Sequence, residues 1–285
     1  MTTAILLISA PDQKGLVAKI ADWVFGLGGN ILHADQHTDA SVGLFLMRVE
    51  WELAGFDLPK EAIAPAFAPI AEIIQAQWQL HFSDTVRRLA IFVTKQDHCL
   101  YDLILRQRSE EYLATIPLVI GNHPDLEAVA HSFGINYHYL PITPDTKTIQ
   151  EAQQLALLQQ YQIDLVVLAK YMQVLSPGFL AKFSQVINIH HSFLPAFAGA
   201  NPYHRAYERG VKIIGATAHY VTADLDEGPI IEQDVIRVSH RDAVADLIRK
   251  GRDLERVVLA RAVRLHLENR VLVYGKSGVR TVIFD

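Results

Sequence analysis

Two residues able to activate a carbonyl group stand two positions apart near the end of an apolar run. They are Asn188 and His190, in VINIHHSFLPAF at 186–197. Residues i and i+2 of a β-strand point to the same side, so both side chains are expected to face one pocket. An asparagine amide donates hydrogen bonds without charge, and a histidine donates, accepts or carries charge near neutral pH. Together they could polarise a carbonyl and stabilise the oxyanion formed when it is attacked.

A second polar segment could complete this chemistry. The stretch AHYVTADLDEGPIIEQ, residues 218–233, has His219 at the end of an apolar run and Asp224 and Asp226 in the loop that follows. A loop carboxylate beside His190 could fix the tautomer of the imidazole, stabilise its cation or orient a water molecule. Plainer roles also fit these residues, namely a hydrogen-bonded core histidine, an asparagine in a turn and a solvated acidic loop.

The elements around these residues alternate between apolar strands and helices. Strands are predicted at 89–94, 116–122, 135–141, 163–169, 185–190, 212–221 and 229–238. Helices are predicted at about 98–109, 125–132, 146–161 and 242–268. This alternation predicts a Rossmann-like, mainly parallel sheet covered on both faces. Ligands bind beyond the carboxyl ends of such strands, which is where Asn188 and His190 lie.

The N-terminal part of the chain is predicted to be a separate α/β module. A strand at 4–9 precedes a helix from Leu16, and two strands then flank a turn at 39–41. A helix bounded or broken by prolines and a strand at 78–83 follow. This is the βαββαβ order of a ferredoxin-like fold. The predicted domains are therefore 1–83 and 89–285, joined by a linker at 84–88.

Composition excludes several classes of protein. The 285 residues carry a net charge of −5 and no dense basic block, so nucleic acid is not an expected partner. The single cysteine, Cys99, cannot form an intrachain disulfide and is expected to be a small buried side chain. No apolar run has the length of a membrane span, and the N-terminus is typical of a strand rather than a signal peptide. A cytoplasmic protein is expected.

Several long motifs resemble the formyltetrahydrofolate deformylase branch of the folate-dependent formyltransferase family. They are IDLVVLAKYMQVLSP, NIHHSFLPAFAGANPYHRAYERG, GATAHYVTADLDEGPIIEQDV and VSHRDAVADLIRKGRDLERVVLARAV. The segment PDQKGLVAKIADWVFGLGGNI resembles the start of an ACT domain. The resemblance implies hydrolysis of 10-formyltetrahydrofolate to tetrahydrofolate and formate. Such an enzyme supplies formate for purine synthesis and balances the one-carbon folate pools.

The resemblance also implies roles for individual residues. The Asn-x-His pair of the family maps to Asn188 and His190, which would bind the formyl oxygen, with His190 protonated. The loop acid maps to Asp226, which would fix His190 and orient or deprotonate a water molecule. His191 and His219 are expected to position water or support the site. Residues expected to bind the folate are Met172, Val174, Leu175, Thr222, Ala223 and Asp224.

Two departures from the transferase branches bear on the acceptor. Transferases acting on phosphorylated amines carry a Gly/Ser-rich loop after the first strand of this domain, whose amides cradle phosphate. The matching segment here, VTKQDHCLYD at 93–102, contains no glycine. His191 stands where transferases usually have proline. Both differences favour water as the acceptor over a phosphorylated amine.

The remaining expectations concern ligands and alternative functions. The ACT-like domain is expected to mediate homo-oligomerisation, to bind an amino acid such as glycine or methionine, or both. The candidate ligand residues are Asp12, Gly15, Asn30 and Ile31. No cofactor or metal is expected, although a metal held by His190, His191, His204 and His219 is an alternative. Two other functions stay open: a formyltransferase acting on an unphosphorylated amine, and a binding regulator with a silent catalytic domain.

Overall fold

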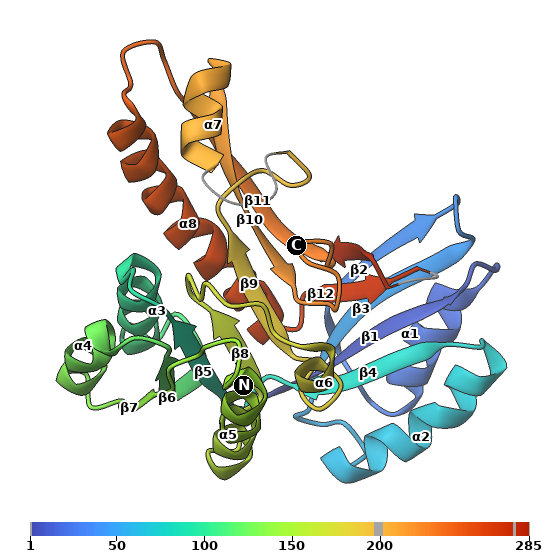
Figure 1. The fold of residues 1–285 in the computed structure, drawn as a ribbon. Coiled ribbons are helices and arrows are strands. Elements are labelled where there is room, and N and C mark those ends of the chain that lie inside the picture. Colours follow the sequence, from blue (N-terminus) through green and yellow to red (C-terminus); the bar gives the residue numbers. More distant parts are fainter. Residues whose placement is uncertain (1, 197–201, 276–277, 285) are drawn as a thin grey trace. The chain divides into compact units, whose positions relative to one another are not determined.

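The chain folds into two compact units in a computed structural model (Figure 1). The structure describes residues 2–196, 202–275 and 278–284. One unit comprises Met1–Thr85 with Glu268–Asp285, and the other comprises Val86–Leu267. The C-terminal segment therefore packs with the N-terminal unit, whereas the sequence placed it in the second domain.

A C-terminal hairpin explains this different boundary. Strands β12 (Val271–Tyr274) and β13 (Arg280–Ile283) pair antiparallel. Leu272 packs with Leu7 of the N-terminal sheet, and the Tyr274 hydroxyl donates to Asp39 at 3.0 Å. The apolar partners of the hairpin lie more than 200 residues away along the chain, so no local sequence pattern predicts its packing on the N-terminal sheet.

The first unit is the predicted ferredoxin-like fold, which the structure confirms. Its elements are β1 (Thr3–Pro11), α1 (Leu16–Gly26), β2 (Ile31–Asp39), β3 (Leu44–Glu52), α2 (Lys60–Ile73) and β4 (Gln77–Phe82). The sheet order is β2-β3-β1-β4, all antiparallel. Alternation along β1 sends Leu6 and Ile8 into the core shared with the helices, while Leu7 packs on the other face with the C-terminal hairpin.

Helix α2 differs from its prediction because two prolines lie inside it. Pro65 and Pro69 neither break nor bound the helix, which runs unbroken through both. Both prolines are exposed, whereas Ile63, Phe67 and Ala71 are buried at a spacing of four residues. Burial of this apolar stripe offsets the roughly 3 kcal/mol that an internal proline costs.

The second unit contains a seven-stranded sheet in the order β11-β10-β9-β8-β5-β6-β7. The strands are β5 (Arg87–Val93), β6 (Ala114–Gly121), β7 (Asn136–Tyr139), β8 (Leu165–Leu168), β9 (Val186–His190), β10 (Ile213–Tyr220) and β11 (Ile230–Arg237). From β7 to β9 neighbouring strands are parallel, and β10 and β11 add antiparallel strands. The predicted mainly parallel sheet is confirmed.

Helices cover the sheet of the second unit. They are α3 (His98–Arg108), η1 (Pro124–Leu126), α4 (Glu127–Ser132), α5 (Lys147–Gln160), α6 (Pro177–Leu180), α7 (Pro202–Arg209) and α8 (Val244–Leu267). Helix α8 runs along β9, β10 and β11 and also packs against α3 (Figure 1). Leu158 of α5 and Phe179 of α6 share a second apolar core with the β5 and β8 strands. None of the helices among the described residues is long and apolar enough to cross a bilayer.

Candidate active site

The antiparallel pairing of β9 and β10 brings the two sequence motifs together. His219 lies directly opposite Asn188 in the register, and the Asn188 Nδ2 atom is 3.2 Å from His219 Nε2. A register shift between Ala218 and His219 marks a bulge in the pairing of β10 with β11. Bulges of this kind re-aim side chains beside active sites. The sheet therefore places an amide and two imidazoles at one strand end.

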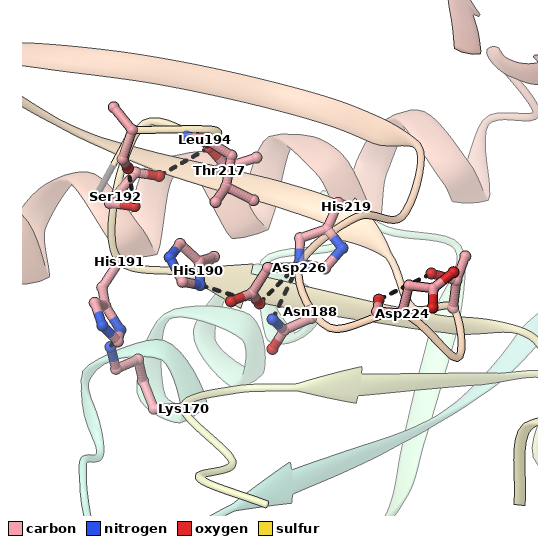
Figure 2. A network of polar contacts seen from close by, with 12 residues as sticks. Lys170, Asn188, His190, His191, Ser192, Leu194, Thr217, His219, Asp224 and Asp226 are labelled. Carbon is pink, nitrogen blue, oxygen red and sulfur yellow. Dashed lines mark hydrogen bonds and ion pairs between the residues drawn. The ribbon is translucent and has the colours of Figure 1, made fainter. Parts of the chain in front are cut away.

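Asp226 occupies the loop after β10 and faces these side chains (Figure 2). Its Oδ1 atom is 3.2 Å from His190 Nδ1 and 3.9 Å from His219 Nε2. The hydrogen bond from His190 lowers the pKa of Asp226 and outweighs the effect of partial burial, so the carboxylate is ionised at neutral pH. Asp226 also has a φ of 59°, a left-handed conformation that non-glycine residues seldom adopt outside turns and functional sites.

The tautomer of His190 follows from this contact. A carboxylate only accepts, so His190 Nδ1 carries a proton and donates it to Asp226. The other ring nitrogen, Nε2, is buried and has no hydrogen-bond partner among the described residues. The Nε2 atom of His190 is therefore the ring nitrogen that could act on a bound molecule while Asp226 holds the ring.

His219 is neutral and orients Asn188. Its Nδ1 atom lies 2.8 Å from the Tyr220 carbonyl oxygen, which only accepts, so Nδ1 carries the proton. Nε2 then accepts one N–H of Asn188, leaving the second N–H of that amide available to a ligand. Burial lowers the pKa of His219 and keeps the ring uncharged at neutral pH.

The lowered pKa of His219 predicts a pH dependence of stability. Below its ordinary pKa of 6.5, the unfolded chain binds a proton that the folded chain resists. The free energy of unfolding should therefore fall as the pH drops below that value. We expect His219→Gln to show a shallower fall than the parent protein in chemical denaturation measured across this range. The exposed His204→Gln serves as the control, and parallel curves for the parent and His219→Gln would contradict the assignment.

The segment after β9 is held in place by a buried threonine. The Thr217 hydroxyl donates to the Ser192 carbonyl at 2.8 Å and accepts from the Leu194 amide at 3.0 Å. This anchors His191, whose ring stacks on that of His190 with centroids 4.9 Å apart and planes 16° apart (Figure 2). The two adjacent histidines therefore form one stacked pair.

A cavity of about 370 Å³ opens beside this cluster. Its lining residues are Leu168, Tyr171, Met172, Gln173, Val174, Leu175, Asn188, Ile189, His190, His191, His219, Val221, Thr222, Asp224, Leu225 and Asp226. The structure thus brings together all but one of the predicted catalytic and folate-binding residues. The exception is Ala223, which is not among the lining residues although both its neighbours are.

The loop on one wall of the cavity is held by polar side chains of α5. Glu151 accepts from the amide and hydroxyl of Ser176, and Gln154 Nε2 donates to the Tyr171 hydroxyl at 2.9 Å. On the opposite wall, Gly228 lets the loop close on β10, because a Cβ there would lie 1.7 Å from the Tyr220 carbonyl oxygen. Hydrogen bonds from α5 therefore position one wall, and the close approach of Gly228 to β10 positions the other.

The segment 93–102, where transferases carry their glycine-rich loop, ends β5 and begins α3. His98 starts that helix, and its Nε2 atom is 2.7 Å from Glu255 Oε2 of α8. Cys99 is fully buried, as expected, and burial raises the pKa of its thiol. Of the described residues, one group could converge on a metal ion, and it is His98, Cys99 and Glu255. It differs from the histidine set considered as an alternative.

Buried charges near the site were missed by sequence reasoning. Lys170 is 5% exposed and Glu255 is 1% exposed, and their charged atoms are 3.2 Å apart. The signal for Glu255 was present: it falls within the apolar stripe that includes Leu254 and Val258 of α8.

The four candidate effector residues do not converge within one chain. Asp12 bonds through its amide to Gly43, at the Leu44 end of β3, and Gly15 caps the start of α1. Asn30 accepts from Glu52 at the other end of β3, next to Ile31. A nine-residue strand spans about 27 Å, so the four residues lie at two separate places in one chain.

The arrangement around His190 suits attack on a carbonyl group. Asn188, His190 and Asp226 all line the cavity, and the ionised Asp226 carboxylate lies 3.2 Å from His190 Nδ1. Two donors can bind a developing oxyanion, and the carboxylate can stabilise the imidazolium and hold a nucleophile. Acyl transfer to water or to an amine fits this geometry.

Comparisons with known proteins agree with these features. The formyl transferase family matches residues 87–263. A protein from Synechocystis named formyltetrahydrofolate deformylase is 65% identical over 99% of this chain and 98% of its own. The crystal structure of a formyltetrahydrofolate deformylase from Pseudomonas syringae pv. tomato has a TM-score of 0.96, 45% identity and coverage of 100% of this chain and 95% of its own. A glycinamide ribonucleotide transformylase 1 from Symbiobacterium toebii has a TM-score of 0.66, 33% identity and coverage of 73% of this chain and 98% of its own.

Proposed function

The chain belongs to the formyl transferase family, and from this membership we propose that its site hydrolyses 10-formyltetrahydrofolate to tetrahydrofolate and formate. It is an enzyme, a formyltetrahydrofolate deformylase. The similarity to proteins of that name extends over nearly the whole chain, including the N-terminal unit. The observation that carries the proposal is the contact between His190 Nδ1 and Asp226, which leaves His190 Nε2 buried beside a cavity large enough for a pterin ring.

The proposed reaction is an attack of water on the formyl carbon. Asp226 holds the water and accepts its proton as the new C–O bond forms. The second N–H of Asn188 and the protonated Nε2 of His190 stabilise the oxyanion of the tetrahedral intermediate. Asp226 passes this proton to N10, the C–N10 bond breaks as the oxyanion re-forms a carbonyl group, and tetrahydrofolate leaves with formic acid, which ionises to formate. The products supply formate for purine synthesis and free folate carrier.

We further propose that the pterin ring lies between the two walls of the cavity. Met172, Val174 and Leu175 provide an apolar wall, and Thr222 and Asp224 belong to the loop opposite. Thr222 donates its hydroxyl to the Asp224 carbonyl at 3.1 Å, which shapes that loop. Ala223 contributes through the loop backbone rather than by lining the cavity.

No metal or other cofactor is proposed for the reaction. Two N–H donors and a carboxylate supply the polarisation and the base that a metal ion would otherwise provide. We expect chelator-treated protein to keep its activity with no stoichiometric metal found by elemental analysis. We also propose a cytoplasmic location, which is supported by a folate substrate and by the single buried cysteine. We propose no nucleic-acid partner, in keeping with the net charge of −5.

We propose that the N-terminal unit is an ACT-like regulatory and oligomerisation domain. Because Asp12 and Gly15 lie far from Asn30 and Ile31 in one chain, one amino-acid site built from all four requires two copies. Glycine or methionine is the proposed effector. Thermal-shift and light-scattering measurements should show a homo-oligomer that is stabilised by one of them. A monomer that responds to no amino acid would contradict this proposal.

The experiment that tests the function follows tetrahydrofolate and formate together. Purified protein is incubated with 10-formyltetrahydrofolate and no amine acceptor. Equal release of both products supports the hydrolase. Release only after an unphosphorylated amine is added would indicate a formyltransferase, and tight folate binding without release under any condition would indicate a regulator.

A further inference from the structure

A buried carboxylate links four elements of the second unit. Glu255 of α8 accepts from His98 Nε2 at 2.7 Å, from the Tyr203 hydroxyl at 2.7 Å and from Lys170 Nζ at 3.2 Å. Gly251 makes room for the Tyr203 hydroxyl, because a Cβ at position 251 would lie 2.1 Å from that hydroxyl oxygen. Burial alone raises the pKa of Glu255, but these partners outweigh it and lower the pKa to about 2. Glu255 is therefore ionised, and its carboxylate accepts three hydrogen bonds from side chains.

Lys170 connects this carboxylate to the stacked histidines. It follows β8 with a φ of 62°, a left-handed backbone that residues other than glycine seldom adopt. Its ammonium group lies 3.2 Å from Glu255 Oε1 and 3.2 Å from His191 Nδ1. A buried ammonium is stable only when it is paired, and Glu255 provides that pairing.

The contact with Lys170 decides the state of His191. An ammonium group only donates, so His191 Nδ1 must accept and cannot carry a proton. The ring is then neutral, with its proton on Nε2. A positive charge on His191 would place two cations, Lys170 and the imidazolium, at hydrogen-bond distance.

We propose that Lys170, anchored by Glu255, is a positioning residue that holds His191 neutral in the Nε2–H tautomer and keeps the positive charge of the stacked pair on His190. The consequence for catalysis rests on the proposed hydrolysis. With centroids 4.9 Å apart, two protonated rings would repel, so a neutral His191 favours the imidazolium of His190 that Asp226 stabilises.

His98, in the segment 93–102, and His191, beside His190, are the two ends of this network. Glu255 and Lys170 join them by hydrogen bonds. Among the described residues, the charged or titratable groups around His191 include Lys170, His190, Tyr203 and Asp226, with Glu255 one contact away.

Nuclear magnetic resonance of ¹⁵N-histidine-labelled protein tests the state of His191 without any assay of activity. The His191 signals are identified by their loss in His191→Asn. We expect a neutral ring with its proton on Nε2 between about pH 6 and 8. In Lys170→Met, the ring should gain a proton as the pH falls through that range or populate the other tautomer. An imidazolium or an Nδ1–H tautomer in the parent protein, or no change in Lys170→Met, would overturn the proposal.

Kinetics test whether the contact matters for the reaction. Lys170→Met and His191→Asn are each expected to lower kcat for formate release by about 10²-fold with little change in KM. The double variant should lose no more than either single variant, because Lys170 acts through His191. Lys250→Met, which removes an ammonium of α8 that pairs with Asp242 before that helix, is the matched control. Melting temperatures of all variants identify any loss of fold.

The magnetic resonance and kinetic experiments distinguish a failure of this proposal from a failure of the proposed hydrolysis. Losses in the double variant that multiply would show that Lys170 acts independently of His191 and would overturn the coupling. If the parent protein releases no formate, the proposed function fails, and the magnetic resonance arm still decides the state of His191.

Discussion

Replacing Asp226 by asparagine is expected to lower the turnover for formate release by about 10³-fold or more. The change keeps the size of the side chain and removes its charge. An asparagine can present its NH₂ group to His190 Nδ1, which reverses the tautomer, and it cannot stabilise the imidazolium or take a proton from water. The measurement is kcat at saturating 10-formyltetrahydrofolate, with folate binding measured separately.

Glu227→Gln provides the matched control for this prediction. Glu227 is the next residue in the same loop, is exposed and does not line the cavity, so the variant should keep its turnover. A loss of less than about tenfold in Asp226→Asn would show that the carboxylate neither fixes His190 nor activates the water. Another group that lines the cavity would then have to activate the water.

Removing the imidazole of His190 is expected to be nearly as severe. His190→Ala should lower kcat by about 10³-fold, and Asn188→Ala by about 10²-fold, because each removes one donor to the oxyanion. The difference reflects charge, since an imidazolium binds an oxyanion more strongly than a neutral amide does. Both variants should bind folate with near-normal affinity because the apolar wall from Met172 to Leu175 is intact.

The comparison of kcat with affinity decides between two roles for His190. A variant that keeps its turnover at saturating substrate but binds folate poorly would make His190 a binding residue. A fall in kcat alone supports its place in the reaction. His204→Gln, an exposed substitution on α7, controls for the loss of a histidine.

Secondary structure was predictable wherever local patterns carried the information. The continuous apolar runs of β5, β6, β8 and β9 and the amphipathic stripe of α8 agree with the structure to within a few residues. Helix α2 shows where such reasoning fails, because its prolines face solvent and its buried stripe outweighs their cost. The C-terminal hairpin was missed because its partners, Leu7 and Leu46, lie at the other end of the chain.

The cavity was also largely predictable, since strand ends and a polar loop marked its position. Asn188 and His190 share a strand and must face one side, and the motif around Asp226 was long enough to stand out. The network behind His191 was not predictable in the same way. Lys170 and Glu255 are 85 residues apart, and each alone is an ordinary charged residue of a loop or a helix.

By itself, the sequence determined the fold class, the family and the residue types at the reaction centre, because hydrophobic periodicity and long motifs are local properties of the chain. The tertiary structure alone decided which nitrogen of each histidine carries a proton, since that depends on partners supplied by other elements. Asp226 places a proton on Nδ1 of His190, the Tyr220 carbonyl places one on Nδ1 of His219, and Lys170 is proposed to leave Nδ1 of His191 without one. A proton on an imidazole is placed by the nearest donor or acceptor, and only folding brings those groups within reach.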